Sequence, residues 1–463
     1  MVDSSRYRFA AMQGMLLVTL MGLVPASMAA DGPLRVHPDN PRYFTDGTGQ
    51  AIYLTGSHTW GNLQDQVTED ARPNLDYADY LDLLAEHNHN FIRLWAWESS
   101  TRAPLPYRRT GPGMALDGKP KFDLARWDQA YFDRLKARVS AAEARGIYVA
   151  VMLFQGWSVA KKLEDRATPW PRHPFHKDNN VNGIDGDIDG NNEGEEIHTL
   201  EQEAVTRLQE TYVRKVVDTL NSYANVLYEI SNESHKGSHA WQHHMIEFIQ
   251  HYQADRPYQH PLVMTVAYPG GDNEPLFRST AEAISPKDTD GAPYQTDPPP
   301  ADGHKVILID SDHLWGIGGD RHWVWKSFTR GLHPIYMDPV NTGRGSSSVK
   351  RRVPGVRLAM GHTLSYASRM DLAKMDPDRN VSTTGYALVN PGMEYLVYQP
   401  RAGVGFRVGL PPGKYDYEFF NAKSGRIESH GQVTAEGPHH FHAPFHSDAV
   451  LYLKRSSPDD DQQ

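Results

Sequence analysis

Short apolar segments recur along this chain, and most of them are almost continuously apolar. Segments of this kind are typical of strands that are covered on both faces, as in parallel sheets. Eight segments predict strands: "AIYLTGSHTW" (51–60), "FIRLWAWE" (91–98), "IYVAVMLFQGW" (147–157), "VLYEISNE" (226–233), "LVMTVAYP" (262–269), "KVILIDSDH" (305–313), "PIYMDP" (334–339) and, with a weaker pattern, "VRLAMGHT" (356–363).

Amphipathic segments between these runs predict helices, the clearest at 123–146, 201–223 and 239–253. Within 201–223, apolar residues recur at three- and four-residue steps from Val205 to Tyr223, which places them on one helical face. About eight βα units in succession predict a (β/α)₈ barrel, or TIM barrel, over residues 31–375. A doubly wound sheet is the alternative. It usually carries a Gly-rich phosphate loop after an early strand, and the sequence shows none.

The pattern changes near residue 376. Short alternating runs are now separated by Pro-Gly, Asn-Pro and Ser-Gly turns. This pattern predicts a small antiparallel β-sandwich over residues 376–455. The polar tail 456–463 is expected to be disordered.

The first thirty residues predict a signal peptide. Arg6 and Arg8 precede the apolar run "MLLVTLMGLV", which is followed by "PASMAA". A basic start, a short apolar run and a small-residue end are typical of a cleaved secretory signal. A signal anchor is the alternative. The run is too short to span a membrane, so we expect no membrane association after cleavage of residues 1–30.

Composition limits the chemistry and the compartment. The chain has no cysteine, which excludes disulfides, thiolate nucleophiles and Cys-ligated zinc. An exported protein without disulfides suits a bacterial secreted or periplasmic location. The formal net charge is −10 and no basic stretch stands out, which argues against a nucleic-acid partner. No organic cofactor is implied, and the oligomeric state stays open.

In a barrel the functional site lies at the carboxyl ends of the strands. The side chains expected to bind substrate there are His58, Trp60, Arg93, Trp97, Gln155, Trp157, Asn232, Tyr268, Asp310, His313 and Trp315. Indole rings stack on the apolar faces of sugars, and carboxylate, amide and guanidinium groups bond to sugar hydroxyls. The set therefore predicts a poly- or oligosaccharide substrate.

Glycoside hydrolysis needs two carboxyl groups, one on each side of the scissile bond. The fourth apolar run ends in Asn232 and Glu233, and its "YEISNES" resembles the fourth-strand motif of clan A glycoside hydrolases. The resemblance implies that Glu233 is the acid/base and that Asn232 bonds to the sugar 2-hydroxyl. "FIRLW" resembles the second strand of the clan, whose Arg, here Arg93, supports the nucleophile.

The resemblance extends to both ends of the chain. "HPDNPRYFTDGTGQAIYLTGSHTW" is similar to the start of cellulase-like and apiosidase-like bacterial members of the clan. The C-terminal part resembles the small β-sandwich described as collagen-binding in such proteins.

The second carboxyl group departs from the clan, whose nucleophile is a Glu at the end of the seventh strand. With "HPIYMDP" taken as that strand, the residue is Asp338. Asp312, in "DSDH", is the rival catalytic candidate, and Asp310 and Glu98 remain open. We expect a retaining mechanism, although the shorter Asp leaves inversion possible because inverting enzymes hold their carboxyl groups further apart.

Other interpretations remain open for this site. "Asp-x-Asp-His" at residues 310–313 could bind a metal. A non-catalytic carbohydrate-binding or adhesive protein would keep the same aromatic residues. A polysaccharide lyase would use a base such as Tyr268 or His313.

A calcium-binding pattern lies in the loop after the third apolar run. Its acidic residues and glycine fit D-x-[DN]-x-[DN]-G-x₅-E. The expected ligands are Asp185, Asp187, Asp189, Asn191 and Glu196. Calcium takes six to eight oxygen ligands and the Gly permits a sharp turn. The sequence thus predicts a structural Ca²⁺, and a solvated acidic loop is the alternative.

Overall fold

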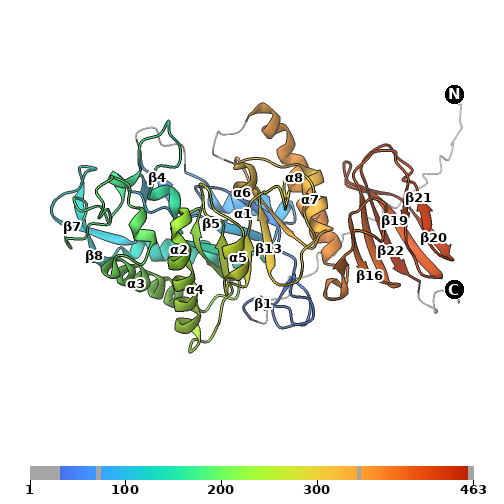
Figure 1. Cartoon of the computed structure of the whole chain (residues 1–463), viewed down its shortest axis with the longest axis horizontal. Helices are drawn as coiled ribbons and strands as arrows, with labels where there is room; N and C mark the ends of the chain where they lie inside the picture. Colours follow the sequence, from blue (N-terminus) through green and yellow to red (C-terminus); the bar gives the residue numbers. More distant parts are fainter. Residues whose placement is uncertain (1–31, 69–73, 341–345, 457–463) are drawn as a thin grey trace, which may run out of the picture.

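The computed structural model describes residues 32–68, 74–340 and 346–456 (Figure 1). The predicted signal peptide, residues 1–30, lies outside these ranges, as does nearly all of the predicted tail. Within the described ranges, no helix combines the length and the apolar character needed to cross a bilayer.

A barrel-like sheet of eight parallel strands forms the first part of the chain. Its strands are β3 (Gly56–His58), β5 (Phe91–Leu94), β9 (Tyr148–Gln155), β10 (Val226–Asn232), β11 (Leu262–Thr265), β12 (Ala283–Ser285), β13 (Val306–Asp310) and β14 (His333–Met337). They run in the order β3-β14-β13-β12-β11-β10-β9-β5. Sequence neighbours are therefore spatial neighbours all the way round.

The two end strands of this sheet also meet, so the barrel is nearly closed. Just before β3 and β5, the Asn90 N–H donates to the Thr55 carbonyl at 3.0 Å. A Cβ atom on Gly56 would lie only 2.1 Å from the carbonyl oxygen of Phe91. Glycine at position 56 therefore permits the approach of β5 to β3. The predicted (β/α)₈ fold is confirmed.

Alternate residues of the strands face the barrel interior. Leu227 of β10 packs in an interior cluster with Phe91 and Ile335. Its neighbour Tyr228 points outward, into the larger core between strands and helices. Glu229 follows on the inward face, and it is fully buried.

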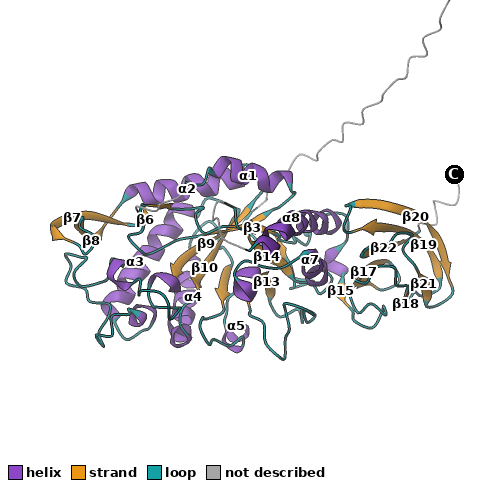
Figure 2. Cartoon of the chain, turned by 90° about the horizontal axis from the view of Figure 1, so that it is seen from above, coloured by secondary structure: helices purple, strands orange, loops and turns teal. Residues whose placement is uncertain are grey.

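Helices surround the strands (Figure 2). They are α1 (Tyr77–Glu86), α2 (Gln129–Glu143), α3 (Glu203–Leu220), α4 (His239–Gln253), α5 (Glu274–Arg278), α6 (Ser311–Trp315), α7 (Arg321–Phe328) and α8 (Ser347–Ala367). Short antiparallel pairs decorate the barrel: β1 (Arg35–Val36) with β2 (Phe44–Thr45), β4 (Asp65–Gln66) with β6 (Arg102–Ala103), and β7 (Tyr107–Met114) with β8 (Pro120–Trp127).

Three sequence predictions were wrong in detail. The segment 356–363 lies in α8, where the buried residues Val353, Val356 and Met360 recur at helical steps. Strand β12 was missed because it has only three residues. The first residues of the predicted helix 123–146 belong instead to β8, and α2 begins after the N-cap Asp128.

The missed strand shifts the strand count. The run at 305–313 contains the seventh barrel strand, β13, and the run at 334–339 contains the eighth, β14. Asp338 therefore follows the eighth strand. The carboxylates at the end of the seventh strand are Asp310 and Asp312.

The C-terminal part is antiparallel, as predicted. A six-stranded sheet has the order β15-β16-β17-β22-β19-β20, and β18 pairs with β21. The strands are β15 (Asp376–Pro377), β16 (Ala387–Asn390), β17 (Glu394–Gln399), β18 (Phe406–Val408), β19 (Gly413–Asn421), β20 (Arg426–Ala435), β21 (His439–Phe441) and β22 (Ala449–Arg455).

The larger C-terminal sheet is apolar on both faces. Leu451 of β22 packs with Phe406 and Phe441 of the small sheet. The preceding residue, Val450, points the other way and joins the core of the barrel. Trp325 of α7 belongs to that same core. Helices α7 and α8 accordingly lie between the barrel strands and the C-terminal sheets (Figure 1).

Candidate active site

A cavity of about 640 Å³ opens at the carboxyl ends of the barrel strands. Tyr268 and Trp315 line it with 37% and 39% of their surface exposed, which is unusual for aromatic residues. The predicted site residues that line this cavity are Trp60, Trp97, Trp157, Glu233, Tyr268, Asp312, His313 and Trp315. The structure therefore brings together eight side chains from distant parts of the sequence.

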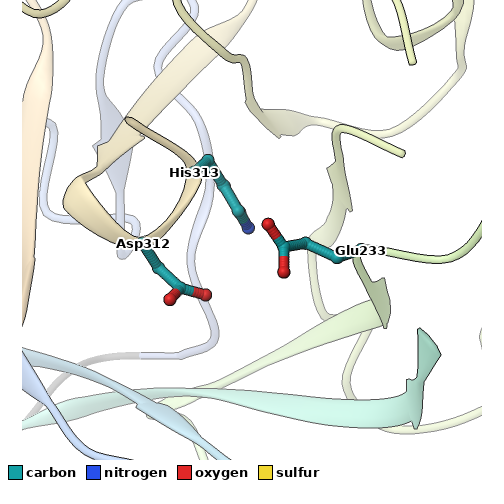
Figure 3. A group of neighbouring side chains, drawn as sticks. All are labelled: Glu233, Asp312 and His313. Carbon is teal, nitrogen blue, oxygen red and sulfur yellow. The ribbon is translucent and has the colours of Figure 1, made fainter. Parts of the chain in front are cut away.

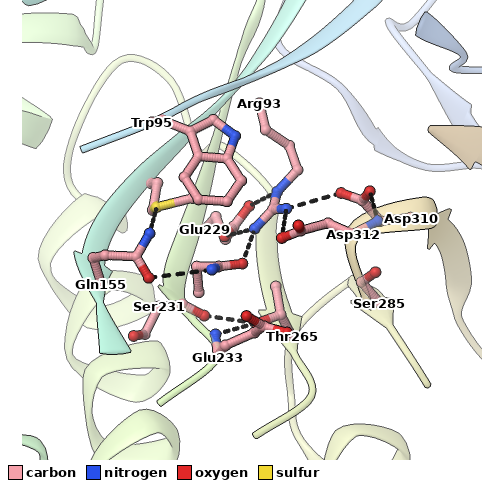
Figure 4. Close-up of polar contacts among 12 residues, drawn as sticks. Arg93, Trp95, Gln155, Glu229, Ser231, Glu233, Thr265, Ser285, Asp310 and Asp312 are labelled. Atoms are coloured by element: carbon pink, nitrogen blue, oxygen red, sulfur yellow. Dashed lines mark hydrogen bonds and ion pairs between the residues drawn. The ribbon is translucent and has the colours of Figure 1, made fainter. Parts of the chain in front are cut away.

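The other predicted substrate-binding residues do not line the cavity and bind one another, as Figure 4 shows for Arg93 and Asp310. They are His58, Arg93, Gln155, Asn232 and Asp310, all buried. The Asn232 amide oxygen accepts from Arg93 at 2.6 Å, and its nitrogen donates to Gln155 at 3.1 Å. Because Asn232 is fully buried and so engaged, its side chain supports the site from below and does not line the cavity.

Arg93 organises this buried layer. Its Nε and Nη2 donate to the two oxygens of Glu229 at 2.7 and 2.5 Å. Its Nη1 donates to Asp310 at 2.8 Å and lies 3.7 Å from Asp312. Burial opposes the charge of Arg93, but the surrounding carboxylates outweigh it and raise its pKa. The guanidinium is therefore a fixed positive charge under the cavity floor.

His58 fixes the position of Asp310. Its Nδ1 accepts a hydrogen bond from the Trp95 indole N–H at 2.8 Å. The proton of the neutral ring is therefore on Nε2, which donates to the Asp310 carboxylate 3.0 Å away. Burial acts against the charge of Asp310, but His58 and Arg93 together lower its pKa. Asp310 is thus a permanently ionised, fully bonded carboxylate.

Glu233 directly follows β10 and has a strained backbone conformation, with φ at +48°. Left-handed backbone at a non-glycine residue costs free energy and is common at functional sites. Its Oε2 accepts a hydrogen bond from the Trp157 indole. A Cβ atom on Gly156 would lie 2.2 Å from the Glu233 carbonyl oxygen. Glycine at 156 therefore allows the turn that carries Trp157 to reach Glu233.

Asp312 lies in α6, directly after β13, and its backbone N–H is bonded to the Asp310 carboxylate at 2.8 Å. Its side chain is 7% exposed. The buried Oδ2 of Asp312 has no hydrogen-bond partner among the described residues. A buried carboxylate oxygen without a hydrogen-bond partner is costly. A hydrogen-bond donor from a bound ligand or a water would remove that cost.

Glu233 and Asp312 face each other across the cavity floor, with His313 beside them (Figure 3). One carboxylate oxygen of each and a ring nitrogen of His313 lie within 4.8 Å of one another. Burial raises the pKa of Glu233 to about 7. Burial and the nearby Glu233 likewise raise the pKa of Asp312. Two carboxyl groups this close share one proton near neutral pH.

Asp338 does not join this pair. Both of its oxygens accept from the Arg357 guanidinium, at 2.6 and 2.7 Å, in a two-pronged ion pair with α8. It is 1% exposed and is not among the residues that line the cavity. The choice of Asp338 as second carboxylate depended on the wrong strand count, and the structure gives Asp338 the surroundings of a structural residue.

His313 is held in a neutral form. Burial lowers its pKa to about 3. Its Nδ1 lies 2.7 Å from the Ser285 hydroxyl and its Nε2 lies 3.2 Å from the Asn232 amide oxygen. Because that oxygen can only accept, Nε2 carries the proton. The ring is therefore held by hydrogen bonds at both nitrogens, which suits an orienting role.

The predicted calcium loop gathers three of its five expected ligands. Oxygens of Asp187, Asp189 and Glu196 lie within 4.8 Å of one another. Asp185 is not in this group, and it lies 3.7 Å from Lys177. The Asn191 side chain accepts from the Glu193 N–H and donates to Asp189. The group that the calcium-loop pattern uses at this place is the backbone carbonyl.

Two sets of residues near the site were missed by the sequence analysis. The first is Glu229, which pairs with Arg93. A charged residue inside an apolar strand could have indicated such a buried ion pair. The second is a histidine pair around Glu98, a residue considered there only as a carboxylate. Glu98 lies 3.4 Å from His173 and 3.7 Å from His198. His198 in turn lies 3.0 Å from the hydroxyl of Ser234, next to Glu233.

Comparisons with known proteins agree with the fold. A family model described as a domain of unknown function, DUF6298, matches residues 87–268. The chain is similar to a solved structure described as a glycoside hydrolase, with 12% identity, a TM-score of 0.58, and coverage of 92% of this chain and 98% of the other. It is also similar to a glycoside hydrolase family 5 protein from Bacteroides vulgatus, with 12% identity, a TM-score of 0.59, and coverage of 92% and 95%.

No curated protein matches the sequence. The two structural similarities each cover both the barrel and most of the C-terminal part. At 12% identity they show a shared fold. The resemblance to clan A barrels is confirmed at that level, and the collagen-binding description of the C-terminal part stays a prediction.

Proposed function

We propose that this protein is an exported glycoside hydrolase that cleaves O-glycosidic bonds of a poly- or oligosaccharide. The observation that carries the proposal is the pair of carboxyl groups, Glu233 and Asp312, which face each other within 4.8 Å at the floor of an aromatic-lined cavity. The similarity in fold to glycoside hydrolases supports the same reaction class.

The geometry supports a retaining mechanism. Retaining enzymes hold their two carboxyl groups about 5–5.5 Å apart, and inverting enzymes leave about 6.5–9.5 Å for a water. One oxygen of Glu233 lies within 4.8 Å of one oxygen of Asp312, which is compatible with the first class. Asp312 attacks the anomeric carbon, and Glu233 protonates the leaving oxygen and later activates water.

The surroundings suit these roles. Burial and Glu233 raise the pKa of Asp312, and Arg93, 3.7 Å away, acts against that shift and so favours the ionised form that a nucleophile needs. Burial keeps Glu233 protonated up to about neutral pH, as a general acid requires. Trp157 and Tyr268 stack in parallel with ring centres 6.0 Å apart, and both line the cavity.

The test is a screen of polysaccharides and aryl glycosides, with product anomers followed by NMR. Hydrolysis with retention of configuration is the expected result. Binding of glycans without turnover would favour the carbohydrate-binding alternative. An unsaturated product that absorbs in the ultraviolet would show a lyase.

We also propose that the loop at 185–196 binds Ca²⁺. The Asp187 carboxylate accepts from the Gly190 and Asn192 N–H groups at 3.0 and 2.9 Å, which folds the loop around the three gathered carboxylates. Oε2 of Glu196 is buried without a hydrogen-bond partner among the described residues. Burial and the neighbouring aspartates raise the pKa of Glu196, and a bound cation would act against that shift.

Calcium binding predicts a chelator-sensitive melting temperature. A ligand of the folded state stabilises it by mass action, by about 2.7 kcal/mol at one hundred times Kd. Chelator should lower the melting temperature, and added Ca²⁺ should restore it. The response should vanish in Asp187→Ala and persist in Asp290→Ala, a change at an exposed site outside the loop. Equal responses in both variants would contradict the site.

A further inference from the structure

The charges that line the cavity are unequal. Four cations line it: Arg102, Lys161, Lys162 and Arg166. Among the described residues, the only carboxylates that line it are the catalytic pair. The chain as a whole has a net charge of −10, so this excess of positive charge is a local feature of the site.

From this arrangement we infer that the substrate is an anionic glycan, whose sugar units carry carboxylate or sulfate groups that contact the cationic wall. The inference rests on the proposed function and deepens it by naming the substrate class.

Arg102 forms one side of the wall. It lies in β6, and its guanidinium carbon is 5.0 Å from the centre of the Trp97 ring. Stacking on an indole orients the guanidinium plane. A planar guanidinium suits the two-pronged recognition of a carboxylate or a sulfate.

The loop after β9 forms the other side of the wall. Lys162 Nζ donates to the Tyr268 carbonyl at 2.7 Å, which holds its ammonium group next to the exposed Tyr268 ring. Burial lowers the pKa of Lys162, while Glu195 and Glu233 act against that shift. An ammonium group that is costly to bury gains from an added anionic partner.

Lys161 and Arg166 lie in the same loop, and both are exposed. The Glu193 carboxylate interacts with the charge of Lys161, but Glu193 does not line the cavity. The loop also contains Glu164 and Asp165, but these two do not line the cavity. The loop therefore presents its positive side chains to the site.

A neutral sugar would not use these charges. Sugar hydroxyls accept hydrogen bonds from ammonium and guanidinium groups, but they leave the charges unneutralised. A carboxylate or sulfate accepts the same hydrogen bonds and adds a Coulomb attraction between opposite charges. Charge complementarity also speeds association, and added salt weakens that effect. An anionic glycan should therefore be preferred in a salt-dependent way.

The experiment compares neutral and acidic oligosaccharides of equal length. The neutral set is cello-, manno- and xylo-oligosaccharides. The acidic set is oligogalacturonides and oligomannuronates, which carry carboxylates, and carrageenan oligosaccharides, which carry sulfate. Turnover is measured with the wild type, and binding is measured by calorimetry with Glu233→Gln. We expect kcat/KM to be at least tenfold higher for one acidic class, and to fall as salt is added.

Variants of the wall locate the effect. Lys161→Gln and Arg166→Gln should each lower kcat/KM for the preferred acidic substrate by about five- to tenfold, mainly through KM, and should remove part of its salt dependence. Lys136→Gln, at an exposed position of α2, is the matched control and should change neither quantity.

The outcomes separate this inference from the proposed function. Hydrolysis of neutral glycans at equal or higher kcat/KM, without salt dependence, would overturn the anionic substrate and leave the hydrolase intact. Tight, salt-sensitive binding of acidic glycans without any hydrolysis would support the anionic ligand and contradict the hydrolase. Wall variants that behave like Lys136→Gln would also overturn the inference.

Discussion

Buried carboxylates occur in two regions of this molecule, and their surroundings differ. At the junction of the barrel and the C-terminal sheets, Asp448 is 2% exposed and fully bonded. It accepts from Arg321 at 2.8 Å, from Ser447 at 2.9 Å and from Tyr398 at 3.0 Å. Burial disfavours its charge, but Arg321 outweighs burial and lowers the pKa of Asp448.

The cavity shows the opposite arrangement. Asp312 keeps an oxygen without a hydrogen-bond partner among the described residues, and Glu233 accepts from the Trp157 indole. Burial raises the pKa of both. A carboxylate whose oxygens all accept hydrogen bonds from the protein stabilises the fold. A desolvated carboxylate with an oxygen that accepts no hydrogen bond is a candidate for chemistry. This difference separates Asp448 from the carboxylates that we propose as catalytic.

The largest expected effect comes from Asp312→Ala. Loss of the nucleophile should lower turnover by about 10³-fold or more, because removal of a catalytic group that acts with others is severe. The fold should be retained, since Asp312 accepts no hydrogen bond with its buried oxygen. Steady-state kinetics of the best substrate from the screen measure the loss, and azide should restore part of it as an inverted glycosyl azide.

The matched control is Asp338→Asn. It breaks the ion pair with Arg357, so it should lower stability while most of the turnover remains. The comparison between the two regions fails if Asp338→Asn loses more activity than Asp312→Ala.

The second effect comes from Glu233→Gln. General acid/base catalysis is worth about 10²–10⁴-fold, and the isosteric amide should lower turnover by that amount. Aryl glycosides with good leaving groups need less protonation, so they should lose less in the first step. A uniform loss across leaving groups in single-turnover kinetics would argue that Glu233 acts in another way.

The third effect is a pH dependence of stability with opposite signs in the two regions. The folded-state pKa of Glu233, about 7, exceeds its ordinary value of 4.5. As pH rises from 4.5 to 7 the unfolded chain loses this proton while the folded protein keeps it. The wild type therefore loses up to about 3 kcal/mol over this range, at 1.36 kcal/mol per pKa unit.

Glu233→Gln removes that titration, so the variant should be more stable than the wild type at pH 8 and equal to it at pH 4. Asp448 has a lowered pKa, so its contribution is present above its ordinary pKa and is lost as pH falls. Urea unfolding at several pH values checks both signs. A Glu233→Gln protein that is less stable than the wild type at pH 8 would contradict the account.

The smallest expected effect is that of Asp448→Asn. Loss of a charged hydrogen-bond acceptor costs about 1.5–3 kcal/mol, and the 30% exposure of Arg321 places the cost at the lower end. The melting temperature should fall, while kcat and KM should not change. An altered kcat would show that the junction communicates with the cavity.

The fold could be predicted from the sequence because continuous apolar strands and helical periodicity persist over long stretches. The exception was β12, whose three residues are too short to leave a periodic pattern. That single omission moved the seventh-strand position from Asp312 to Asp338. Topology errors of one strand therefore reassign a catalytic residue even where the fold class is right.

The sequence predicted residues that belong to the site, but not which of them line the cavity and which are buried beneath it. Strand ends identified Glu233, Asp312 and the aromatic residues, which do line the cavity. The sequence could not show that Asn232 and Asp310 accept hydrogen bonds from Arg93 and therefore do not line the cavity. These hydrogen bonds depend on three-dimensional contacts among strands that are far apart in the chain.

Covalent trapping tests the central claim most directly. A 2-deoxy-2-fluoro glycosyl fluoride of the sugar found in the screen should accumulate a glycosyl-enzyme intermediate, because the fluorine slows its hydrolysis. Peptide mass spectrometry should then locate the label on Asp312. A label on Asp338 or Asp310, or an active enzyme that forms no covalent intermediate and yields inverted products, would contradict the account.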